Sequence, residues 1–132
     1  MGLSEHKVEV VIAVSDLDQA RAFYEDQLGL RLGPRQDVED QGVRYTCAAG
    51  TGIFVYLSPD NAGKSSATLA GWFVDDLDET MTDLSSRGVT FEHYDLPGIS
   101  TDARGVFDDG RLKAAWVKDP DGNTIALTEL ST

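Results

Sequence analysis

Apolar and polar residues follow a pattern that occurs twice, sixty residues apart. The apolar run 8–14 leads into Ser15-Asp16-Leu17-Asp18, and the run 68–74 leads into Asp75-Asp76-Leu77-Asp78. The first run is β-branched and bounded by polar residues, which predicts a strand that is buried on both faces or nearly so, and the second run predicts its counterpart. The chain is therefore expected to consist of two copies of one unit.

An amphipathic helix is expected after each of these strands. Ser15 and Asp75 are predicted to be the N-capping residues, because short polar side chains that can accept a backbone hydrogen bond favour this position. Apolar residues then recur at helical spacing until a glycine ends each pattern, at Gly29 in the first copy and Gly88 in the second.

Three further strands complete each copy. They are predicted at 30–33, 43–48 and 53–58, and again at 89–93, 112–118 and 124–130. Turn residues join the last two strands of each copy into a hairpin, with Asp119-Pro120-Asp121-Gly122-Asn123 as the clearest example. The sequence thus predicts an α+β fold of two βαβββ modules, about 7–58 and 67–131, in a single domain 1–132 with a linker at 59–66.

The segment 95–110 departs from the repeat because it is longer than the corresponding loop of the first copy. It is either a lid over a functional site or a surface excursion. Phe107 in this segment and Trp116 on the following strand are candidates for the wall of a cavity mouth.

Charge and composition narrow the classes of partner. Eleven basic and twenty-three acidic side chains give a net charge of −12, which disfavours nucleic acid and anionic membranes. No apolar run approaches the ~20 residues of a membrane span, and no signal sequence is recognisable, so a cytoplasmic protein is expected. The single cysteine, Cys47, is interpreted as a small buried residue rather than a reactive thiol.

Several motifs resemble the vicinal oxygen chelate superfamily, also called the glyoxalase/bleomycin resistance/dioxygenase superfamily. They are Val10 to Leu17, Ala22-Phe23-Tyr24, Leu28-Gly29 and the turn Asp119 to Asn123, and Lys113 to Lys118 is similar to small bacterial members. The resemblance covers nearly the whole chain. It implies paired βαβββ modules that form a curled mixed sheet around a cavity, usually in a homodimer.

The resemblance also implies where a divalent metal ion would be bound. In metal-using members, four His, Glu or Gln side chains point into the cavity, and the matching positions here are Glu9, Tyr56, Leu69 and Ala126. Leu69 and Ala126 have no donor atom, whereas a catalytic site needs about three protein donors. No metal and no other cofactor is therefore expected, and Glu9 is the only candidate for a catalytic residue, as a general base.

Strand alternation places further side chains on the face that holds these positions. The residues expected on that face are Glu9, Val11, Ala13, Phe54, Tyr56, Leu69, Gly71, Phe73, Thr124 and Ala126. The result would be an apolar chamber with one carboxylate, in which Phe54, Tyr56 and Phe73 could stack on a planar ligand and Glu9 could pair with a cation. The same aromatic residues would also serve as ordinary core. Trp116, at the mouth of the cavity, is a further candidate for ligand binding.

Three functions remain open from the sequence. The preferred one is a metal-free protein that binds a small organic molecule, cationic or aromatic, for example to sequester an antibiotic or a metabolite. The alternative is a divalent-metal-dependent lyase, thiol transferase or dioxygenase of the same superfamily. The third is a regulatory module whose sheet surface binds another protein.

Overall fold

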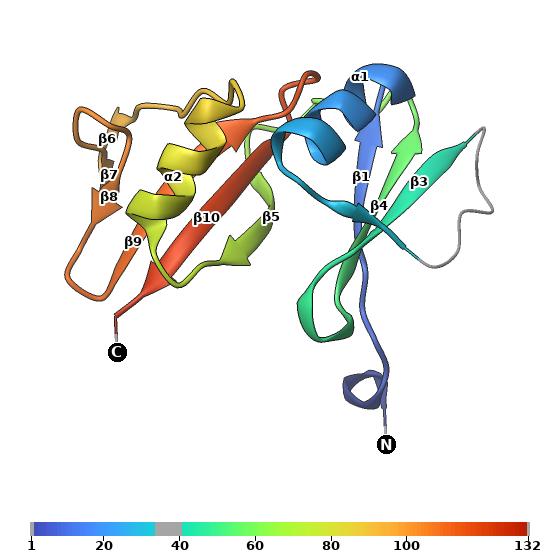
Figure 1. Cartoon of the computed structure of the whole chain (residues 1–132), viewed down its shortest axis with the longest axis horizontal. Coiled ribbons are helices and arrows are strands. Elements are labelled where there is room, and N and C mark those ends of the chain that lie inside the picture. The colour runs from blue at the N-terminus through green and yellow to red at the C-terminus, as the bar shows by residue number, and fades with distance from the viewer. Residues whose placement is uncertain (1, 34–40, 132) are drawn as a thin grey trace. The chain divides into compact units, whose positions relative to one another are not determined.

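The computed structural model of the chain describes residues 2–33 and 41–131. The chain divides into two compact units, Met1–Ser65 and Ser66–Thr132. Each unit holds a four-stranded mixed sheet with a helix against one of its faces (Figure 1). Residues 34–40 of the first predicted module lie outside the described part. Within the described ranges, no helix is both long and apolar enough to cross a membrane.

The first unit begins with a short 3-10 turn and continues as strand, helix and three strands. Its elements are η1 (Leu3–Glu5), β1 (Val10–Val14), α1 (Leu17–Arg21), η2 (Ala22–Gln27), β2 (Arg31–Leu32), β3 (Gly42–Thr46), η3 (Ala48–Gly50) and β4 (Gly52–Leu57). The strand order is β1-β4-β3-β2, in which β1 is parallel to β4 and the other neighbours are antiparallel.

The second unit repeats this topology with an added hairpin. Its elements are β5 (Thr68–Phe73), α2 (Leu77–Ser86), β6 (Asp95–Leu96), β7 (Ile99–Ser100), β8 (Phe107–Asp108), β9 (Leu112–Lys118) and β10 (Thr124–Leu130). The order β5-β10-β9-β8 again places the first strand parallel to the last one. The α+β class and the repeat predicted from the sequence are confirmed.

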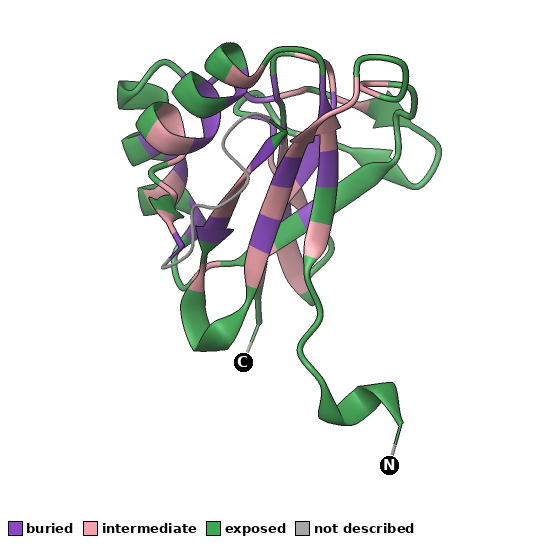
Figure 2. Cartoon of the chain, turned by 90° about the vertical axis from the view of Figure 1, so that its right-hand side faces the viewer, coloured by how far each residue is buried: buried purple, intermediate pink, exposed green. Residues whose placement is uncertain are grey.

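Burial alternates along the strands, as Figure 2 shows. In β1, Ile12 and Val14 are fully buried, whereas Val11, which precedes Ile12, is 53% exposed. The prediction that this strand is buried on both faces is therefore wrong, because only the face that carries the helix is covered. The alternation itself follows the period of two expected for a half-covered sheet.

Both helices start one residue later than the sequence predicted. The N-cap of α1 is Asp16 rather than Ser15, and its carboxylate accepts a hydrogen bond from the Gln19 amide at 3.1 Å. In α2 the N-cap is Asp76 rather than Asp75, with the equivalent bond from the Glu79 amide at 3.0 Å. Either residue of each pair has a suitable side chain, and the extended backbone of the second one decides the position.

The first helix contains an extra residue relative to the second. The sequence has one residue more between Asp16 and Gly29 than between Asp76 and Gly88. This residue is accommodated in η2, a π-helical segment in which the Leu28 amide donates to the Phe23 carbonyl five residues earlier, at 2.8 Å. Insertion of one residue into a helix is the usual origin of such a wide turn.

Glycine ends both helices, but the strands that follow are unequal. Gly29 and Gly88 have φ angles of 77° and 90°, as expected for helix C-terminal glycines. β2 forms as predicted, whereas the strand expected at 89–93 is reduced in the structure to one isolated antiparallel bridge, Phe91 to Val117. The outer edge of β9 is paired further along with β8 instead.

Candidate functional site

The predicted site residues fall into two groups, one on the sheet of each unit. Glu9, Phe54 and Tyr56 belong to the first unit, and Leu69, Phe73, Trp116 and Ala126 belong to the second. In each case they occupy the sheet face opposite the buried helix side.

In the first unit, an arginine that the sequence analysis missed lies between the predicted residues. Arg44 donates to the Glu9 carboxylate through Nε at 2.7 Å and Nη2 at 3.3 Å, which makes a two-point ion pair. Its guanidinium carbon lies 4.5 Å from the centre of the Phe54 ring, and Phe54 stacks on Tyr56 with 6.0 Å between ring centres. A carboxylate, a guanidinium and two aromatic rings therefore lie next to one another in a row.

This ion pair changes the chemistry expected of Glu9. A carboxylate held by a guanidinium is not the lone negative charge of an apolar chamber, so the local argument for a cationic ligand is lost. Arg44 is the cross-strand partner of Phe54. The hairpin of 43–48 with 53–58 was predicted from the sequence, but its register was not. A pocket of about 430 Å³ next to the pair is lined by both Glu9 and Arg44 and by Lys7.

In the second unit, Trp116 and Ala126 are direct cross-strand partners on β9 and β10. Ala126 in turn pairs with Gly71 of β5, so small residues lie beside the indole ring. Phe73, at the end of β5, is 77% exposed. The register thus places Trp116 on the same sheet face as Ala126 and Phe73.

Trp116 is also the centre of an aromatic cluster. The Tyr94 ring meets it edge to face with 5.4 Å between centres, and Phe107 lies at 6.4 Å. Burial first, and the nearby Glu92 carboxylate second, raise the pKa of the Tyr94 hydroxyl. Tyr94 therefore remains a neutral hydrogen-bonding group at physiological pH.

A pocket of about 310 Å³ opens against this cluster. Its lining residues are Ser66, Ala67, Thr68, Tyr94, Leu96, Ile99, Trp116, Lys118 and Thr124. All of them belong to the second unit. The volume lies at the small end of the ~300–1,000 Å³ range of ligand pockets.

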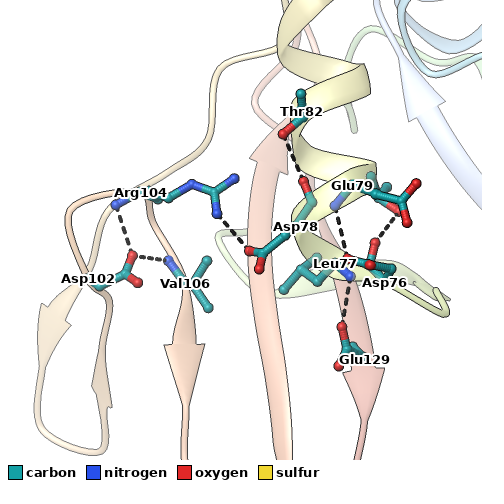
Figure 3. Close-up of polar contacts among 10 residues, drawn as sticks. Asp76, Leu77, Asp78, Glu79, Thr82, Asp102, Arg104, Val106 and Glu129 are labelled. Carbon is teal, nitrogen blue, oxygen red and sulfur yellow. Dashed lines mark hydrogen bonds and ion pairs between the residues drawn. The ribbon is translucent and has the colours of Figure 1, made fainter.

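The segment 95–110 forms one wall of this pocket and is linked to helix α2 by an ion pair. It contributes Leu96 and Ile99 to the lining, and Arg104 donates to the Asp78 carboxylate of α2 at 2.6 Å (Figure 3). Asp102 accepts from the amides of Arg104 and Val106 at 2.8 and 2.9 Å, which stabilises the turn. The segment is therefore structured, with strands β6, β7 and β8, and is not a plain loop.

The residues at the family's metal positions do not fit a divalent ion. Glu9 is engaged by Arg44, Tyr56 stacks on Phe54, and Leu69 and Ala126 have no donor atoms. No group of three or more His, Cys, Asp or Glu side chains suited to a metal ion occurs within the described ranges. The His93 side chain is engaged elsewhere, because its Nε2 lies 3.0 Å from the Ala103 carbonyl oxygen. We therefore derive no chemistry through a metal ion.

One buried hydroxyl in the pocket lining lacks a partner. Thr124 is 2% exposed, and its Oγ1 has no hydrogen-bond partner within the described part of the chain. An unsatisfied buried hydroxyl costs about 1–3 kcal/mol. Replacement of Thr124 by valine is therefore expected to raise the free energy of unfolding by about 1 kcal/mol, measured by urea denaturation.

Thr101 provides the matched control for this substitution. Its hydroxyl accepts from the Tyr94 amide at 2.8 Å and donates to the Tyr94 carbonyl at 3.2 Å. Thr101→Val removes both bonds and should lower the free energy of unfolding by about 1–2 kcal/mol. A loss of stability in Thr124→Val would show that the hydroxyl is satisfied in solution.

Comparison with known proteins identifies the family. The family model of the Glyoxalase/Bleomycin resistance protein/Dioxygenase superfamily matches residues 8–127. The chain belongs to this superfamily. A search of curated proteins found no match.

Solved structures with the same fold include both binding proteins and enzymes. A glyoxalase/bleomycin resistance protein from Catenulispora acidiphila is 25% identical with a TM-score of 0.66, over 95% of this chain and 98% of that one. TnmS3, an antibiotic binding protein from a Streptomyces species, is 24% identical with a TM-score of 0.66, over 96% of both chains. A lactoylglutathione lyase from Agrobacterium tumefaciens is 21% identical with a TM-score of 0.63, over 94% and 92%.

Proposed function

We propose that the chain is a metal-free binding protein for a small aromatic molecule, of the glyoxalase/bleomycin resistance type. The observation that carries this proposal is the 310 Å³ pocket against Trp116 and Tyr94, in which aromatic and aliphatic surface is available to a ligand. A concave apolar site with a few polar groups is the usual form of a ligand site.

The chemistry of the predicted metal positions supports binding over metal-dependent catalysis. Two of the four positions lack donor atoms, and the Glu9 carboxylate is in an ion pair with Arg44. The antibiotic-binding relative TnmS3 makes sequestration of a bioactive aromatic compound a reasonable role.

We further propose that the chain acts as a homodimer. Sedimentation velocity tests this proposal, and a monomer at micromolar concentration would contradict it.

Thermal unfolding of the purified chain with a panel of aromatic natural products tests this function. A ligand that binds the folded state alone stabilises it by about 2.7 kcal/mol at one hundred times its Kd, so saturable increases in Tm are expected for part of the panel. Trp116→Ala should abolish these increases in Tm. Trp72 lies on the other face of the sheet, so the increases should persist in Trp72→Phe.

Metal analysis of the same samples separates binding from the enzymatic alternative. We expect no stoichiometric Zn, Mn, Fe or Ni after dialysis and no change in Tm with chelator. One tightly held ion per chain that is lost in Glu9→Gln would establish the metal-dependent lyase, transferase or dioxygenase instead. A panel with no stabilising compound at all would contradict the binding function.

A further inference from the structure

The pocket in the second unit carries a charge opposite to that of the chain. The protein has a net charge of −12, but among the described lining residues of this pocket Lys118 alone is charged. Charges beyond about 8 Å are largely screened at physiological ionic strength. The charges near the pocket, and not the net charge, therefore decide which ligand it favours, and the Lys118 ammonium is the one among them that belongs to the described lining.

The Lys118 ammonium retains capacity for a further partner. Its side chain is 43% exposed, and its contact with the Glu92 carboxylate is 3.9 Å long. This distance exceeds the range of an N–H···O hydrogen bond, so the pairing is electrostatic and loose. An ammonium has three donors, and those that point toward the pocket can meet an anionic group there.

The other walls select a flat apolar body. Tyr94 and Trp116 stand nearly perpendicular to one another, with an angle of 82° between their planes. Leu96 and Ile99 are 58% and 38% exposed and line the same pocket. A planar ring system placed here would cover exposed aliphatic surface and contact aromatic faces or edges, both of which favour binding.

We propose that this pocket takes a planar aromatic molecule with one anionic group, such as a bicyclic carboxylic acid, a choice that rests on the proposed function. The ring system lies against Trp116, Tyr94 and the aliphatic pair, and the carboxylate lies at the Lys118 ammonium. Such a ligand is anionic, whereas a cationic or aromatic one was expected from the sequence.

Three probes with the same ring system and different charge test this inference: 2-naphthoate, its planar neutral isostere 2-naphthamide, and 2-naphthylmethylammonium. The chain has two tryptophans, so its nitrogen-15 spectrum shows two indole N–H signals, which Trp72→Phe assigns. Naphthoate should shift the Trp116 signal saturably and leave the Trp72 signal in place. Its Kd should be about fivefold lower than that of naphthamide, the upper end for an exposed ion pair.

Lys118→Met should remove this preference without weakening naphthamide binding. Lys113→Met is the matched control, because Lys113 lies on the same strand and is not part of the pocket lining. Equal or tighter binding of naphthamide or the ammonium probe would overturn the anionic class and leave the proposed function standing. The preference persisting in Lys118→Met would overturn the role of this lysine.

If none of the three probes shifts the Trp116 signal at millimolar concentration, the inference is wrong. The proposed function is then decided by the broader thermal panel, which includes compounds of other shapes.

Discussion

Replacement of Asp119 by alanine is expected to lower the free energy of unfolding by about 3 kcal/mol. Asp119 is 5% exposed, and its carboxylate closes the turn between β9 and β10. Oδ1 accepts from the amides of Asp121 and Asn123 at 3.0 and 2.9 Å, and Oδ2 accepts from the Asn123 side chain at 2.8 Å. The substitution leaves the buried Asn123 donors and the part-buried Asp121 amide without that partner, which costs more than the bonds themselves contribute.

Urea unfolding followed by circular dichroism measures this loss, with Asp109→Ala as control. Asp109 makes a similar turn, with bonds from the amides of Arg111 and Leu112 at 2.9 and 3.1 Å, but it is exposed. Water can replace its carboxylate, so a loss of no more than about 1 kcal/mol is expected. Equal losses for the two variants would show that burial of the first turn does not matter.

The same substitution should also weaken ligand binding. The turn fixes the register in which Trp116 faces Ala126 across the β9–β10 pair. A one-residue slip in a hairpin moves every side chain to the opposite face. The Trp116 indole signal in the Asp119→Ala variant, recorded where the chain is still folded, should therefore shift even without probe.

Gly105→Ala is expected to cost about 3 kcal/mol, because two effects combine. Gly105 has φ of 97°, which L side chains rarely adopt, and an added Cβ would lie 2.7 Å from the Glu92 carbonyl oxygen. That oxygen belongs to backbone and cannot rotate away. The segment that forms the pocket wall must move to relieve the clash, so probe binding at Trp116 should weaken as well.

Gly110→Ala separates the two effects. Gly110 has a similar φ of 86°, but nothing lies within 4 Å of an added Cβ. Only the backbone strain remains, and a loss of about 1 kcal/mol is expected with probe binding unchanged. Chemical denaturation of both variants gives the comparison, and similar losses would mean that the close approach to Glu92 relaxes at little cost.

The sequence was most informative where local signals agree. The strands predicted at 112–118 and 124–130 have the observed bounds of β9 and β10, because an apolar run lies on each side of a turn with proline, aspartate and glycine. The helix starts were displaced by one residue, since Ser15 and Asp16 are both good capping residues and only backbone conformation distinguishes them. The strand predicted at 89–93 is reduced to one bridge, because β8 pairs with the same edge of β9. Nothing in the sequence indicates this pairing.

The candidate site was less accessible to sequence reasoning. Family spacing selected Glu9 as the lone carboxylate, but Glu9 forms an ion pair with Arg44, thirty-five residues away in sequence. The pocket at Trp116 depends on Tyr94, Leu96 and Ile99, from a segment with no periodic pattern. Such contacts are long-range and follow from strand pairing and the path of an irregular segment, which a local pattern does not encode.

The π-helical segment Ala22–Gln27 shows how the two halves of the chain were able to diverge. An extra residue in an ordinary α-helix would rotate everything after it by roughly 100°. Here one widened turn accommodates it, Gly29 still ends the helix, and β2 still pairs with β3. The difference in length between the two helices is thus confined to one turn, while the two sheets keep the same strand order.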